Sequence, residues 1–111
     1  MKITKEKNKI YFDFEDKSSA NINIKNDFIK IELIKTELKY RGQRFASKIL
    51  KYIIGYIKIN FKSIKKILLS PLPLDINGLD LNELISFYKR YNFKKSDMPS
   101  REEPHLMVRY I

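Results

Sequence analysis

Residues 39–50 read KYRGQRFASKIL and join two segments of different hydrophobic periodicity. Before them, residues 28–36 (FIKIELIKT) have the pattern of a β-strand. After them, apolar residues recur at the spacing of one face of a helix, which we expect from about Arg41 to Asn60. A strand, a tight turn and a helix start leave unpaired backbone N–H groups at the positive end of the helix dipole. The stretch therefore predicts an anion-binding loop.

Three side chains of this loop favour a phosphate as the anion. Arg41 supplies a charge, Gly42 allows a tight bend and a close approach of the ligand, and Ser47 offers a hydroxyl in the first helical turn. A single glycine inside the helix, Gly55, costs up to about 1 kcal/mol relative to alanine. Its presence indicates either a close packing contact or a bend.

Two segments carry a resemblance to a known family. RGQRFA, residues 41–46, resembles the R/Q-x-x-G-x-G/A signature of the GNAT (GCN5-related) N-acetyltransferases, whose loop binds the pyrophosphate of acetyl-coenzyme A. FYKRYNF, residues 87–93, looks like the FYEKLGF segment of the same family. Together the two cover roughly residues 28–93. The departure is Arg44, which replaces a glycine and either adds a charge to the phosphates or blocks the loop; we expect the added charge.

The chain as a whole predicts one α/β (α+β) domain over residues 1–111. Alternating segments at 10–15 and 20–25 predict a hairpin, and a third strand at 29–34 completes an antiparallel meander. In that third strand we expect Ile29, Ile31 and Leu33 to alternate with Lys30, Glu32 and Ile34.

A helix, a strand, a helix and a strand follow the meander. Lys66 to Ser70 predicts a buried strand parallel to the third one. Asp80 and Glu83 have capping-box spacing for a second helix ending near Asn92, and LMVRYI at the end predicts the last strand. This order is that of the acyl-CoA N-acyltransferase-like fold which the resemblance implies, with a mixed sheet that opens after the third strand.

The family usually carries one or two helices between its first two strands, and they form much of the acceptor pocket. This chain has no room for them. The acceptor site would then be built from loops, from the tail or from a second subunit, so a homodimer is one possible arrangement.

Composition limits the classes of function. The balance of 23 Lys and Arg against 13 Asp and Glu gives a net charge of +10, which favours a phosphate-rich ligand. We do not expect nucleic acid to be the main partner, because the lysines are spread along the sequence. Without cysteine and with one histidine, His105, thiolate or paired-imidazole metal sites are excluded, and we expect no metal. No apolar run is long enough to span a membrane, so we expect a cytoplasmic protein.

The resemblance implies an N-acetyltransferase that transfers the acetyl group of acetyl-coenzyme A to an amine by direct attack in a ternary complex. It implies that the strand backbone holds the acetyl carbonyl and the pantetheine arm, and that the loop holds the pyrophosphate. The coenzyme-binding residues would be Leu33, Ile34, Thr36, Arg41, Gly42, Gln43, Arg44, Phe45, Ala46 and Ser47.

The resemblance also suggests two catalytic residues. Tyr88 stands where GNAT enzymes often keep a tyrosine that donates its proton or a hydrogen bond to the leaving thiolate. A phenol with a pKa near 10 is a reasonable donor to the sulfur of a thiol whose pKa is roughly 8.5. Tyr88 also lies on the apolar face of its helix, which is equally typical of a core residue. Glu32 resembles the strand carboxylate that serves as general base in some members, although a solvated glutamate is the commoner role. His105 is a weaker candidate.

Two other functions remain open at this stage. One is a catalytically weak or inactive GNAT-like module that binds coenzyme A or a partner. The other is a basic nucleic-acid-binding protein. The sequence does not name the acceptor amine, which is a small molecule, a peptide or a protein.

Overall fold

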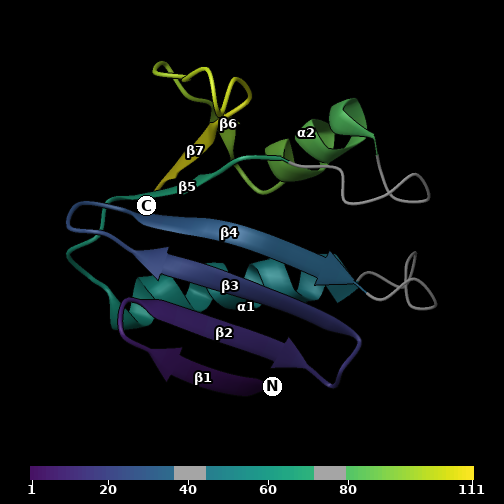
Figure 1. The fold of residues 1–111 in the computed structure, drawn as a ribbon, viewed down its shortest axis with the longest axis vertical. Helices are drawn as coiled ribbons and strands as arrows, with labels where there is room; N and C mark the ends of the chain where they lie inside the picture. Colours follow the sequence, from purple (N-terminus) through teal and green to yellow (C-terminus); the bar gives the residue numbers. More distant parts are fainter. Residues whose placement is uncertain (37–44, 72–79) are drawn as a thin grey trace.

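The structure is a computed structural model that describes residues 1–36, 45–71 and 80–111. Within them, seven strands form one mixed sheet of order β1-β2-β3-β4-β5-β7-β6 (Figure 1). The elements in chain order are β1 Lys2–Glu6, β2 Lys9–Phe14, β3 Ser18–Ile24, β4 Ile29–Thr36, α1 Phe45–Asn60, β5 Lys66–Leu69, α2 Leu81–Lys89, β6 Lys94–Lys95 and β7 Met107–Tyr110.

The meander has four strands, so the prediction of three was wrong. β1 (KITKE) pairs antiparallel with β2 through a two-residue turn at Lys7 and Asn8. Its residues are exposed except for Ile3, which packs against the core. A strand at the edge of the sheet buries little, and charged residues protect its free edge from pairing with other chains. The β2–β3 connection is the predicted hairpin without a helix, and the unpredicted β1 is joined to β2 in the same way.

A β-bulge in β4 changes which residues face the core. In the pairing with β3, Ile31 lies opposite Ile22 and Leu33 lies opposite Asn21, so Glu32 is the extra residue. The bulge shifts the alternation by one position. Ile34 packs against the core and Leu33 is 39% exposed, which reverses the orientation predicted for these two residues.

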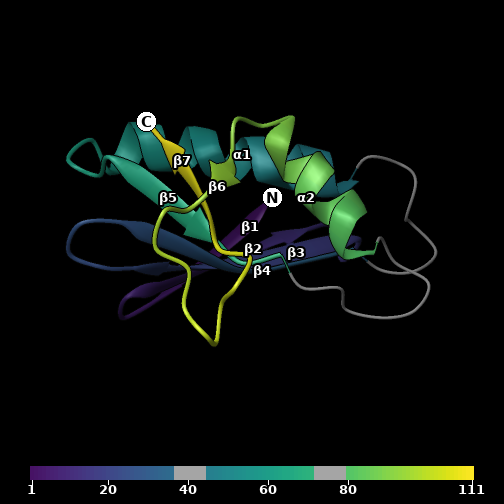
Figure 2. The ribbon, with the colours of Figure 1, turned by 90° about the horizontal axis from the view of Figure 1, so that it is seen from above.

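The helix–strand–helix–strand part follows the prediction. β4 and β5 are parallel, and the connection between them contains α1, whose buried stripe is Phe45, Ile49, Leu50, Ile53, Ile54 and Ile57. The predicted start of this helix at Arg41 lies outside the described residues. α1 and α2 lie on the same side of the sheet, and no described helix covers the other side of β1–β4 (Figure 2). The core fills the space between the helices and the sheet. None of the described helices combines the length and the apolar character that a membrane span needs.

The capping box of α2 is confirmed. The Asp80 carboxylate accepts a hydrogen bond from the Glu83 backbone N–H at 2.8 Å, and the Glu83 carboxylate accepts one from the Asp80 backbone N–H at 3.2 Å. The helix ends at Lys89 rather than near Asn92, because Asn92 has a φ of 68°. A left-handed residue terminates a helix, and asparagine tolerates that conformation better than most residues.

Candidate functional site

The second half of β4 has a free edge within the described part of the chain. β4 and β5 pair only from Ile29 to Ile31, where β5 ends at Leu69. From Glu32 to Thr36, β4 pairs with β3 alone. Backbone N–H and C=O groups on the open side of this segment are available to an extended ligand. This agrees with the expectation that the sheet opens after this strand.

The bulge residue Glu32 is exposed, and its carboxylate faces β2 rather than the free edge. Its carboxylate lies 3.7 Å from the Lys9 ammonium group of β2, and both side chains are partly exposed. The neighbouring residues Leu33 and Ile34 belong to the segment of β4 that has the free edge, and the backbone polar groups of alternate residues in this segment point to that edge. Thr36 ends the strand, as expected.

Two lysines lie near the start of α1, and one of them, Lys17, is ion-paired with Glu15 at 3.3 Å. The first turn of α1 has no acidic residue. The Phe45 ring is buried 5.7 Å from the Phe14 ring, and the ammonium groups of Lys17 and Lys48 each lie 5.2 Å from its centroid. Ala46 and Ser47, the next two residues, are half-buried. The other predicted loop residues, Arg41, Gly42, Gln43 and Arg44, lie outside the described residues.

Tyr88 is a buried residue in the last turn of α2. Its ring packs edge-on against Phe87 at 5.2 Å and against Phe93 at 6.0 Å, and it belongs to the main hydrophobic core. Burial raises the pKa of Tyr88 from its ordinary value of 10 to about 12. The phenol is therefore fully protonated at neutral pH, the state required of a hydrogen-bond or proton donor.

Comparison with solved structures identifies the fold. The structure matches the anti-CRISPR protein AcrVA5 with a TM-score of 0.73 and 17% identity, over 90% of this chain and 96% of that one. It matches the PaiA N-acetyltransferase of Thermoplasma acidophilum in complex with coenzyme A with a TM-score of 0.66 and 14% identity, over 93% and 60% of the two chains. It matches a GNAT family acetyltransferase from Elizabethkingia anophelis with acetyl-CoA bound with a TM-score of 0.68 and 15% identity, over 93% of this chain and 75% of that one.

The chain has the GNAT fold. No protein-family profile matches its sequence, and no curated protein sequence matches it. The likeness is therefore one of structure at low identity. The chain spans 60% of the PaiA enzyme but 96% of the anti-CRISPR protein.

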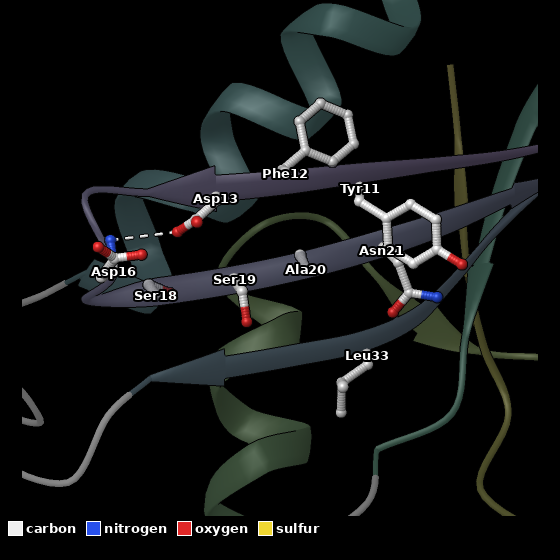
Figure 3. A pocket seen from close by; sticks show the side chains of 9 residues that line it. All are labelled: Tyr11, Phe12, Asp13, Asp16, Ser18, Ser19, Ala20, Asn21 and Leu33. Carbon is white, nitrogen blue, oxygen red and sulfur yellow. Dashed lines mark hydrogen bonds between the residues drawn. The ribbon is translucent and has the colours of Figure 1, made fainter. Parts of the chain in front are cut away.

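In this GNAT fold, the face of β1–β4 that points away from α1 carries a shallow hollow of about 450 Å³ that the sequence did not predict. Figure 3 shows Tyr11 and Asn21 side by side on it, with Leu33 on the neighbouring strand and Asp13 accepting a hydrogen bond from the Asp16 backbone. Strand alternation places Tyr11, Asp13 and Asn21 on one face, but only the fold shows that no described helix covers them.

The segment between β6 and β7 projects to the side of the sheet that faces away from α1 (Figure 2). The Lys30 ammonium group of β4 forms an ion pair with Glu103 of this segment. His105, two residues further on, is exposed. In the described residues, no group of three His, Asp or Glu side chains is arranged to hold a metal ion.

Proposed function

We propose that this protein is an N-acetyltransferase that transfers the acetyl group of acetyl-coenzyme A to an amine. The observation that carries the proposal is the free edge of β4 from Glu32 to Thr36, in a GNAT fold whose structural neighbours include proteins with coenzyme A or acetyl-CoA bound. An extended pantetheine arm offers amide groups that can pair with such an edge in the manner of an added strand.

Each predicted binding residue has a role in this proposal. The backbone of Leu33, Ile34 and Thr36 would hold the pantetheine arm and the acetyl carbonyl. The phosphates would lie at the loop and the start of α1, near the Lys48 ammonium group. Because the Phe45 ring is buried, its contribution would come from its backbone N–H. The remaining loop residues would be Arg41, Gly42, Gln43, Arg44, Ala46 and Ser47.

The chemistry needs a proton acceptor for the amine and a donor for the leaving thiolate. Acetyl-CoA, when bound, supplies the acyl group as a thioester. Glu32 is suited to accept a proton from the amine, because its carboxylate is partly exposed and it belongs to the segment of β4 that has the free edge. Tyr88 is suited to donate a hydrogen bond to the thiolate, because its hydroxyl is protonated at neutral pH; its raised pKa makes full proton transfer less favourable.

A second function is favoured by one observation. No described helix covers the face of β1–β4 that points away from α1, so an enclosed acceptor pocket is not formed there by the described residues. A GNAT-shaped module that binds coenzyme A without transferring the acetyl group fits this feature.

Two measurements separate these functions. A thermal-unfolding shift of the full chain with acetyl-CoA tests coenzyme binding, and release of free thiol with a panel of amines and lysine-containing peptides tests transfer. Binding with turnover supports the enzyme. Binding without turnover by any acceptor supports the module, and the absence of a thermal shift at millimolar acetyl-CoA rejects both.

A further inference from the structure

Positive charge is distributed unevenly along this chain. Residues 1–36 contain eight lysines and six carboxylates. Residues 45–71 contain six lysines and no carboxylate, and residues 89–96 contain Lys89, Arg90, Lys94 and Lys95, again with no carboxylate. The ion pairs found in the described residues all involve lysines of β2, β4 or the turn after β2. The unbalanced positive charge of the described residues therefore belongs to residues 45–71, which hold α1 and β5, and to residues 89–96, which hold β6.

Several of these lysines gather at one end of the molecule. α1 ends there, the loop into β5 begins there, and the chain terminates there at Ile111, whose N–H donates to the Lys65 carbonyl at 2.9 Å (Figures 1 and 2). We call this the basic end and define it by the following residues: Lys58, Lys62, Lys65, Lys66, Lys94 and Tyr110.

Aromatic rings lie among the ammonium groups of the basic end. Tyr110 is 60% exposed, lies opposite Lys66 in the β5–β7 register and has the Lys94 ammonium group 5.1 Å from its centroid. The Lys66 ammonium group lies 5.9 Å from the centroid of Phe28. Asp27, next to Phe28, is the only carboxylate in residues 25–31.

Coenzyme phosphates do not account for this charge. The proposed phosphate loop precedes α1, whereas the basic end follows it. A helix of 16 residues is about 24 Å long, so the two sites are separated by roughly that distance. Lys48 near the start of the helix is placed to serve the coenzyme, but Lys58, Lys62 and Lys65 are not.

We propose that the basic end binds single-stranded nucleic acid. Several ammonium groups gathered at one end of the molecule can contact successive phosphates of a strand, and their binding releases condensed counterions. The exposed Tyr110 ring adds a surface on which an unpaired base can stack, which an acidic protein partner would not need. This activity is separate from acetyl transfer and does not depend on it.

The test uses the full chain and fluorescently labelled 20-nucleotide oligo(dT) and oligo(U), followed by fluorescence anisotropy at 50 and 200 mM NaCl. The test variant is Lys62→Gln/Lys65→Gln/Lys94→Gln, which removes three exposed charges from the basic end. Its matched control is Lys2→Gln/Lys5→Gln/Lys7→Gln, which removes three exposed charges from β1 and its turn. A third variant, Tyr110→Ala, removes the ring.

We expect the test variant to bind at least tenfold more weakly than the wild type at 50 mM NaCl, and its log–log salt slope to fall by about 2, since each lost phosphate contact on a single strand is worth about 0.7. The control should bind nearly as well as the wild type. Tyr110→Ala should weaken binding roughly tenfold. Saturating coenzyme A should not displace the oligonucleotide.

Four results would overturn the proposal: no wild-type binding at 50 mM NaCl, equal losses in the two triple variants, displacement by coenzyme A, or competition by polyglutamate with no effect of Tyr110→Ala. The last of these would indicate an acidic protein as the partner.

Discussion

Tyr88 is held in place by the turn that follows it. Its carbonyl accepts hydrogen bonds from the backbone N–H groups of Tyr91 at 2.9 Å and Phe93 at 3.2 Å, and the left-handed Asn92 makes that turn possible. Asn92 occupies the position of the glycine in the family segment FYEKLGF. Its backbone has a positive φ, and glycine and asparagine adopt such a conformation more readily than other residues. The resemblance of FYKRYNF therefore has a conformational cause.

The first prediction is that Tyr88→Phe abolishes most of the turnover while keeping coenzyme binding. The ring and its packing remain, so the free energy of unfolding should fall by no more than about 1 kcal/mol. Loss of a positioned acid typically lowers the rate by on the order of a hundredfold or more. Thiol release and acetyl-CoA affinity measure the two effects. The matched control is Tyr91→Phe, in the same turn, which should leave turnover unchanged; equal turnover in both variants would make Tyr88 a core residue only.

The second prediction concerns stability at alkaline pH. Because the folded pKa of Tyr88 is raised from 10 to about 12, folding favours its neutral form. This contribution to stability is complete below pH 10 and is lost as the pH rises from 10 to 12. Urea unfolding at pH 9 and pH 11 should show the wild type losing about 1 kcal/mol more than Tyr88→Phe. Parallel losses in the two proteins would show that the phenol is not desolvated.

The third prediction tests Glu32 as the general base. Glu32→Gln keeps the size of the side chain and removes its charge, so turnover should fall on the order of a hundredfold and the acidic limb of its pH profile should disappear. Losing the exposed pair with Lys9 should cost less than about 1 kcal/mol of stability. Lys9→Gln is the control, because it breaks the same pair but keeps the carboxylate. A similar loss of turnover in both variants would assign the pair a structural role.

At the scale of elements, strong periodicity was enough to predict most of the fold. β2, β3, α1, β5, α2 and β7 follow patterns of apolar spacing and capping that act locally. β1 and β6 were missed because a strand with charged side chains, or one of two residues, is stabilised by its partner strand and not by its own pattern. The bulge at Glu32 was missed because Leu33 and Ile34 are both apolar, so the sequence does not reveal which of them faces the core.

The fourth prediction is that Gly55→Ala stabilises the protein. The sequence suggested a close contact or a bend at Gly55, but a Cβ added there meets no heavy atom within 4 Å, so no close contact requires glycine. Alanine should therefore gain up to about 1 kcal/mol of helix propensity, or roughly 4–8 °C in Tm. Gly55→Val, in which a β-branched side chain has a lower helix propensity, is the control and should gain less. A lower Tm for Gly55→Ala would mean that the position has a packing partner.

At the scale of the whole molecule, the candidate site combines what the sequence predicts with what only the fold shows. The presence of α1 and the candidate Tyr88 follow from short segments of sequence. The free edge of β4 and the uncovered face around Tyr11 depend on where β5 ends and on the absence of described helices over β1–β4, which are properties of the assembled sheet. The net charge of +10 likewise gave no indication that its excess lies on α1 and β5.

The last prediction separates the two ends of α1 by their ligands. Coenzyme A carries a 3′-phosphate that dephospho-coenzyme A lacks, and charges at the start of α1 should recognise it, so coenzyme A should bind several-fold more tightly at 50 mM NaCl and this advantage should shrink at 500 mM. Lys48→Gln/Lys51→Gln should reduce the advantage, whereas Lys58→Gln/Lys62→Gln, at the other end of the helix, should leave it intact. Calorimetric titration of both coenzymes into the three proteins measures each affinity directly. Equal affinities for the two coenzymes at low salt would mean that the lysines at the start of α1 do not contact the coenzyme, and that its binding depends on the β4 backbone and the loop alone.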